Sequence, residues 1–123
     1  MINTDNHYDH VMGNAFLTPN IICHTMAEKE MGYLRDKPLL KKVIKLVFPE
    51  VFPAHGSDID KLDIPPPHIT FDKEMTLNMG DATICLEFAG GHSPGTILVY
   101  LKEEKVYGDW IARQQGLELR ETC

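Results

Sequence analysis

The spacing of apolar residues predicts two helices in the first half of the chain. Over residues 38–48 apolar side chains recur every three or four positions, and lysines occupy the opposite face, which is typical of an amphipathic helix. Upstream, Thr25 followed by Glu28 matches a capping box, with Thr25 as the capping residue. This motif predicts a helix from residue 26 to about residue 33.

Short apolar runs predict strands before and after these helices. The run at residues 21–23 follows a Pro-Asn turn and is typical of a buried strand in a parallel sheet. Residues 49–67 contain five prolines, which predicts a surface connection without a long helix or a central strand. The later runs, separated by turn residues, predict a β meander with strands at residues 69–71, 75–79, 83–88 and 97–101. This order of elements indicates a layered α/β or α+β fold.

Composition and charge narrow the classes of partner. The 123 residues suffice for a single domain, and 12 Lys and Arg against 18 Asp and Glu give a net charge of −6. This balance argues against nucleic acid and anionic lipid as partners. No apolar stretch approaches the length of a membrane-spanning helix, and the first residues lack the features of a secretory signal. We therefore expect a cytoplasmic protein that does not enter a membrane.

The three cysteines are widely spaced and form no Cys-x-x-Cys pair. This pattern indicates reduced structural thiols rather than a zinc ribbon or a redox motif. Cys85 lies in an apolar run and is expected to act as a small buried apolar residue.

The first segment with clear chemical potential is residues 5–10, in which Asp5, His7, Asp9 and His10 are all possible metal ligands. Imidazole nitrogens and carboxylate oxygens bind zinc, iron or manganese. In an extended loop, alternation places Asp5, His7 and Asp9 on one side, with His10 at the following turn. A solvated polar N-terminus explains the spacing equally well, so the spacing alone leaves both interpretations open.

A second candidate ligand, His92, lies in the glycine-rich turn of residues 90–95, between two predicted strands. Functional residues are often found on such loops. With this turn, three motifs in order resemble those of the metallo-β-lactamase superfamily of metal-dependent hydrolases. Residues 5–10 resemble its His-x-His-x-Asp-His motif, residues 91–95 its Gly-His-(Ser/Thr)-x-Gly turn, and Gly108-Asp109 its bridging-aspartate motif. The resemblance covers nearly the whole chain.

The resemblance implies a fold, a metal centre and a reaction. The fold would be part of an αββα sandwich holding one or two metal ions, usually zinc. His7 and His92 would bind the first ion, Asp9 and His10 the second, and Asp109 would bridge them. Asp9 could also act catalytically, by orienting or deprotonating the attacking water. The expected substrate is a small-molecule ester, thioester, lactone or amide.

The chain also departs from the family pattern. Asp5 stands where the family usually has its first histidine, and a carboxylate there would favour iron or manganese. The chain has neither the strands that precede the first motif in the family nor a metal-binding histidine after Asp109. Residues 1–123 are therefore expected to form one incomplete domain. Its open sheet edge predicts a homodimer, strand exchange or poor solubility.

Three functions follow from these features. The first is a metal-dependent hydrolase. The second is a mononuclear iron oxidoreductase of the same fold, and the third is a non-catalytic metal-binding or structural remnant of it. Among the other histidines, His24 is expected to be a packed or capping residue, whereas His55 and His68 fall in the proline-rich connection.

Overall fold

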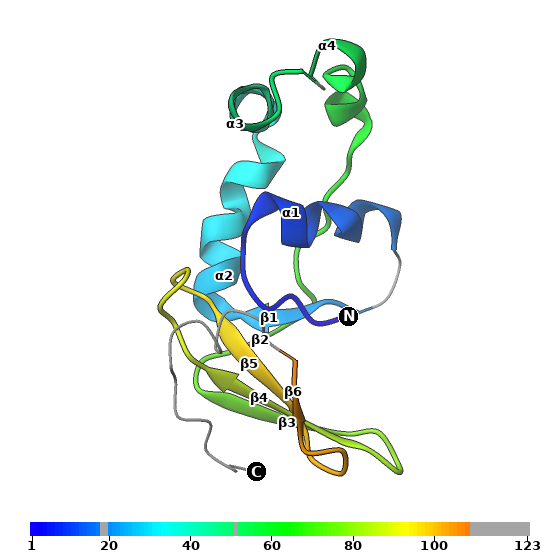
Figure 1. Cartoon of the computed structure of the whole chain (residues 1–123), viewed down its shortest axis with the longest axis vertical. Coiled ribbons are helices and arrows are strands. Elements are labelled where there is room, and N and C mark those ends of the chain that lie inside the picture. The colour runs from blue at the N-terminus through cyan, green and yellow to red at the C-terminus, as the bar shows by residue number, and fades with distance from the viewer. Residues whose placement is uncertain (18–19, 51, 109–123) are drawn as a thin grey trace.

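Helices and strands occupy separate halves of the protein, which belongs to the predicted α/β class (Figure 1). The structure is a computed structural model that describes residues 1–17, 20–50 and 52–108. None of the helices in these ranges is long and apolar enough to cross a membrane. The helical half contains α1 (Tyr8–Val11), η1 (Met12–Phe16), α2 (Thr25–Glu30), η2 (Met31–Arg35), α3 (Lys37–Val47), α4 (Phe52–His55) and η3 (Asp58–Lys61).

The strands form two sheets. β1 (Ile22–His24) pairs in parallel with β2 (Ile69–Phe71), as the apolar run at residues 21–23 predicts. The remaining strands form an antiparallel meander in chain order, as predicted for residues 75–79, 83–88 and 97–101. They are β3 (Glu74–Asn78), β4 (Thr83–Phe88), β5 (Ile97–Leu101) and β6 (Val106–Tyr107). Residues 69–71 are predicted to belong to the same meander, and this part of the prediction is wrong, because they pair with β1 in the other sheet.

The short strand β1 lies between two hydrophobic cores. Successive side chains of a strand point to opposite faces, so Ile22 and Cys23 enter different cores. Ile22 packs in the sheet core with Phe71, Leu86 and Ile97. Cys23 packs in the core formed mainly by helical residues, namely Val11, Ala27, Met31, Leu34, Leu40, Ile59 and Ile64. β1 therefore holds the helical half and the sheet half together.

The start of α2 differs from the capping box that the sequence suggests. The Thr25 hydroxyl donates to the carbonyl oxygen of Phe71 at 3.2 Å, so it is engaged with β2. The cap is His24, whose Nδ1 accepts the backbone N–H of Met26 at 3.1 Å. The predicted helix is confirmed and continues as η2, but the assignment of Thr25 as its cap is wrong.

The amphipathic helix α3 forms close to its predicted bounds, and the Asp36 carboxylate caps it by accepting the N–H of Leu39 at 3.1 Å. In the described part of the proline-rich segment after it, the short helices α4 and η3 are the only helices or strands. This agrees with the predicted surface connection.

The cysteines differ from the expectation that all three are reduced. Cys23 is free and fully buried, whereas Cys85 is disulfide-bonded. The prediction is therefore wrong for Cys85, because spacing along the sequence does not reveal which side chains the fold brings together.

Burial of Cys23 predicts a pH-dependent stability. Desolvation, reinforced by the Glu28 carboxylate, raises the pKa of the Cys23 thiol from its ordinary 9.0 to about 11. Between these pH values the unfolded chain loses a proton that the folded chain retains, so the free energy of unfolding falls as pH rises. We expect a loss of up to about 1.4 kcal/mol per pH unit above pH 9. Urea unfolding at pH 8 and pH 10 measures it, and a Cys23→Ala variant with the same pH dependence as the wild type would contradict it.

Candidate functional site

The N-terminal segment connects both sheets and thereby positions Asp5. The Asn3 N–H donates to the Ile22 carbonyl of β1 at 2.9 Å, and the Thr4 carbonyl accepts the Ile97 N–H of β5 at 2.9 Å. Asp5 is the next residue after Thr4, so it lies close to the turn that precedes β5 and carries His92. Two segments far apart in sequence meet there.

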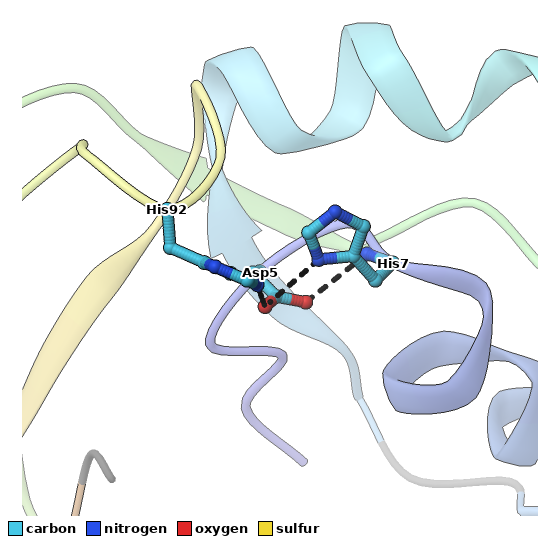
Figure 2. A group of neighbouring side chains, drawn as sticks. All are labelled: Asp5, His7 and His92. Atoms are coloured by element: carbon cyan, nitrogen blue, oxygen red, sulfur yellow. Dashed lines mark hydrogen bonds and ion pairs between the residues drawn. The ribbon is translucent and has the colours of Figure 1, made fainter. Parts of the chain in front are cut away.

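Asp5 is the centre of the site. Its side chain is only 1% exposed, although a carboxylate is costly to bury. One oxygen, Oδ1, accepts the His7 backbone N–H at 3.0 Å and lies 3.0 Å from Nδ1 of His10. The other, Oδ2, lies 3.3 Å from Nδ1 of His7 and 3.8 Å from Nε2 of His92 (Figure 2). Three imidazole rings therefore surround one buried carboxylate.

Asp5, His7 and His92 form a group that could hold a metal ion. One ligand atom from each residue lies within 4.8 Å of the others. The rings of His7 and His92 meet edge to face with centroids 4.7 Å apart. Both rings are partly exposed, so the group faces solvent on one side. Two nitrogens and one oxygen are a donor set that zinc, iron and manganese all accept.

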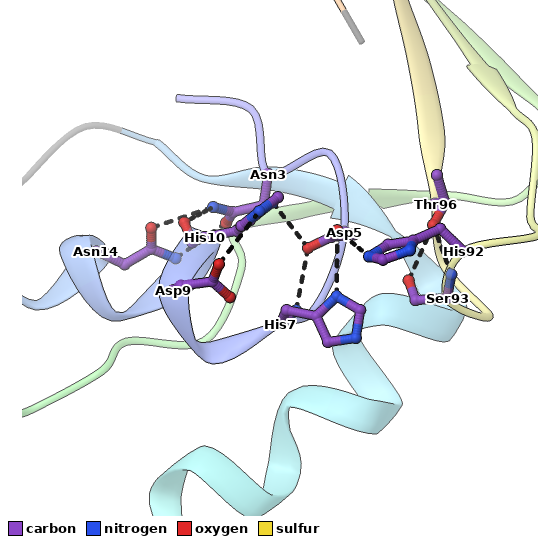
Figure 3. A network of polar contacts seen from close by, with 9 residues as sticks. All are labelled: Asn3, Asp5, His7, Asp9, His10, Asn14, His92, Ser93 and Thr96. Carbon is purple, nitrogen blue, oxygen red and sulfur yellow. Dashed lines mark hydrogen bonds and ion pairs between the residues drawn. The ribbon is translucent and has the colours of Figure 1, made fainter. Parts of the chain in front are cut away.

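The extended loop expected for residues 5–10 ends at His7, because Tyr8–Val11 forms α1. The expectation that Asp5, His7 and Asp9 share one side by alternation is therefore wrong. Asp9 is 60% exposed, and its Oδ2 lies 3.7 Å from Nε2 of His10 (Figure 3). The other ring nitrogen of His10, Nδ1, contacts Asp5. Asp9 and His10 are thus adjacent to the group, and their assignment to a second metal stays a prediction. Asp109, the predicted bridging ligand, lies outside the described residues.

The turn that carries His92 is shaped by glycines and hydroxyls. Gly90 and Gly91 have φ angles of 64° and 87°, in the left-handed region that favours glycine. The Ser93 N–H donates to Oγ1 of Thr96 at 2.9 Å, and both side chains are buried. This hydrogen bond closes the turn that precedes β5 and thereby helps to hold the backbone of His92 in place.

A buried pair of asparagines supports the other side of the site, and the motif search did not identify it. Asn14 Nδ2 donates to Asn3 Oδ1 at 2.9 Å, and Asn3 Nδ2 donates to Asn14 Oδ1 at 3.2 Å (Figure 3). Asn3 Nδ2 also lies 3.4 Å from the His10 carbonyl oxygen. The pair ties the N-terminal segment to η1 and holds α1 with its histidine in place. Nothing in the spacing of residues along the sequence indicates that Asn3 and Asn14 pair, because the contact depends on how the chain folds.

Tyr33 is a second residue that sequence reasoning missed. Burial and the neighbouring Tyr8, Asp9 and Asp5 raise the pKa of its phenol. Its hydroxyl therefore stays protonated near the start of α1, where it is close to the acidic side of the site.

The remaining histidines have structural roles. His24 caps α2, lies with its Nε2 2.7 Å from the Asp72 carbonyl oxygen, and stacks on Phe88. This confirms its expected packing and capping role. Nδ1 of His68 accepts the Ile21 N–H at 3.1 Å, and exposed His55 lies 3.3 Å from Asp58. None of these three belongs to the group of Asp5, His7 and His92, which we call the Asp5 group.

No protein-family model matches the chain, and no curated protein matches it significantly. The metallo-β-lactamase resemblance therefore stays a prediction. The chemistry of the site rests on the contacts of Asp5.

Close packing at Gly95 predicts that this residue maintains the His92 turn. A Cβ at Gly95 would lie 2.6 Å from Cα and 2.5 Å from Cβ of Ala27, in the first turn of α2. We expect Gly95→Ala to lower the free energy of unfolding by about 1–3 kcal/mol. Gly32→Ala is the matched control, because a Cβ there meets no atom within 4 Å, and it should be neutral or stabilising by up to about 1 kcal/mol. Urea denaturation checks both, and equal effects would contradict the packing argument.

Proposed function

We propose that this chain is a metal-dependent hydrolase of the metallo-β-lactamase type, acting on an ester, thioester, lactone or amide of a small molecule. The observation that carries the proposal is the convergence of His7 and His92, which are far apart in the sequence, on the buried carboxylate of Asp5. The order of the three motifs in the sequence supports the same conclusion.

The residues present fit a divalent cation. A carboxylate buried among imidazoles is poorly solvated, and a cation beside it would compensate its charge. Asp5, His7 and His92 would hold the ion, with zinc as the expected metal and a second ion at Asp9 and His10. Bound there, a divalent cation lowers the pKa of a coordinated water and polarises a carbonyl oxygen.

The residues of the chain itself have separate tasks in this proposal. The Asp5 carboxylate orients the His7 ring through Oδ2, which contacts Nδ1, and its Oδ1 accepts the backbone N–H of His7. A carboxylate that orients a histidine ligand is a common feature of metal sites. Exposed Asp9, at the start of α1, is the group placed to accept a proton from the attacking water. His10, between Asp9 and Asp5, fixes the Asp9 carboxylate by its contact with Nε2.

A second candidate, a mononuclear iron oxidoreductase, is favoured by the composition of the ligand group. Two histidines and one carboxylate with open positions are the ligand set of many non-haem iron enzymes. Asp5, His7 and His92 match this set. A non-catalytic metal-binding protein is the third possibility, and the identity of the metal and the presence of turnover separate all three.

The first test is metal content by elemental analysis of protein purified without chelator. We expect about one to two ions per chain in the wild type, and a loss of at least about tenfold in metal affinity in Asp5→Asn and His92→Ala. His55→Ala is the matched control, because this histidine is exposed and outside the group. The folded state of each variant is checked by circular dichroism.

Each result identifies one function. Zinc or manganese with hydrolysis of p-nitrophenyl esters or thioesters, abolished by a chelator and restored by the metal, supports the hydrolase. Bound iron with turnover of an oxidation rather than a hydrolysis supports the oxidoreductase, and bound metal with neither reaction supports the non-catalytic metal-binding protein. Absence of metal in the folded wild type after incubation with zinc, iron or manganese would refute the hydrolase, the oxidoreductase and a non-catalytic metal-binding protein, and would leave a structural remnant of the fold.

A further inference from the structure

A cavity of about 460 Å³ lies between α1, α3 and the segment that contains α4 and η3, and Tyr8 and Asp9 of α1 are part of its lining. In Figure 1 α3 and α4 stand at one end of the protein, with α1 beneath them. The volume is in the range of about 300–1,000 Å³ that small-molecule sites occupy. The cavity is therefore large enough for part of an organic substrate.

The walls of the cavity are mainly apolar. Tyr8 of α1 meets Phe48 edge to face, with ring centroids 6.2 Å apart. A charged or strongly polar group would lose its hydration against such walls without gaining partners. The part of a ligand that enters must therefore be uncharged and apolar. The other apolar side chains of the lining are Met12, Ile44, Phe52, Ile59 and Leu62.

The acidic residues of the lining lie in two places. Asp58 is engaged by Lys61 at 2.8 Å and by His55 at 3.3 Å, so its charge is compensated outside the apolar walls. Asp9 lies on the side of the cavity toward His10, and its carboxylate is 3.7 Å from Nε2 of His10. His10 in turn lies 3.0 Å from Asp5. Two side chains thus connect the apolar cavity with the proposed reaction centre.

From this continuity we infer that the cavity binds the apolar acyl or aryl group of the substrate, while the bond to be broken lies near Asp9 and His10. The inference rests on the proposed function, and it narrows the substrate class to esters, thioesters or amides of medium-length apolar acids. Short acyl groups such as acetyl would leave most of the cavity unfilled.

Binding of octanamide to the metal-free protein tests the cavity without depending on turnover. Isothermal titration calorimetry should detect octanamide but not acetamide, with the negative heat-capacity change of apolar burial. Ile44→Trp, which fills the cavity, and Phe48→Ala, which removes one wall, should each weaken binding by at least about tenfold. Leu46→Trp is the matched control, because Leu46 lies on the same helix, is 83% exposed and does not line the cavity.

With metal bound, kcat/KM for p-nitrophenyl octanoate should exceed that for p-nitrophenyl acetate by at least about tenfold in the wild type and in Leu46→Trp. The ratio should fall toward one in Ile44→Trp. Circular dichroism verifies that each variant is folded, and Phe48→Ala provides the comparison if Ile44→Trp does not fold.

The outcomes separate the two proposals. Octanamide binding that is lost in the cavity variants but kept in Leu46→Trp supports the cavity as a site for an apolar chain, even if no ester is hydrolysed and the hydrolase proposal fails. A preference for p-nitrophenyl octanoate that is lost in Ile44→Trp then assigns this site to the substrate. No octanamide binding to the wild type, or equal binding in all variants, overturns the inference, even if esters are hydrolysed.

Discussion

The burial of the Asp5 carboxylate is the constraint on which the site depends. A buried charge without compensation costs several kcal/mol. Among the described residues, the ion-pair partners of Asp5 are all histidines, from both sides of the site. Their rings are placed by the need to satisfy one carboxylate, so the geometry of a metal centre is present in the contacts of the protein itself. The same arrangement leaves the rings of His7 and His92 partly exposed to solvent.

The carboxylate reaches its position through a short segment that both sheets hold. Asn3 bonds to β1 and Thr4 to β5, and β1 itself lies between the two cores. Packing of the sheets against the helices is thereby coupled to the site. A shift of β1 would move Asp5 away from the His92 turn, while the Asn3–Asn14 pair resists the same shift from the helical side.

Features with local periodicity could be predicted from the sequence, and features made by long-range contacts could not. The strands β2, β4 and β5 have the predicted bounds, and α3 differs by one residue at each end, because alternation and helical spacing are properties of neighbouring residues. The four-residue helix α1 is too short to show a period, so it was not predicted. A packing or capping role was expected for His24, but the cap of α2 was assigned to Thr25, because histidine is an unusual helix cap. The meeting of His92 with Asp5 was expected only from the family resemblance.

The ligands of the site also determine when it can form during synthesis. Asp5 and His92 are 92 − 5 = 87 positions apart, so the first ligands leave the ribosome long before the last one. Closing so long a loop is entropically costly, and the contacts that repay it include the pairing of the N-terminal segment with β5. The nascent chain therefore presents Asp5 and His7 without their partner until His92 has been synthesised. The complete group of Asp5, His7 and His92 can therefore assemble only after the β5 region has left the ribosome.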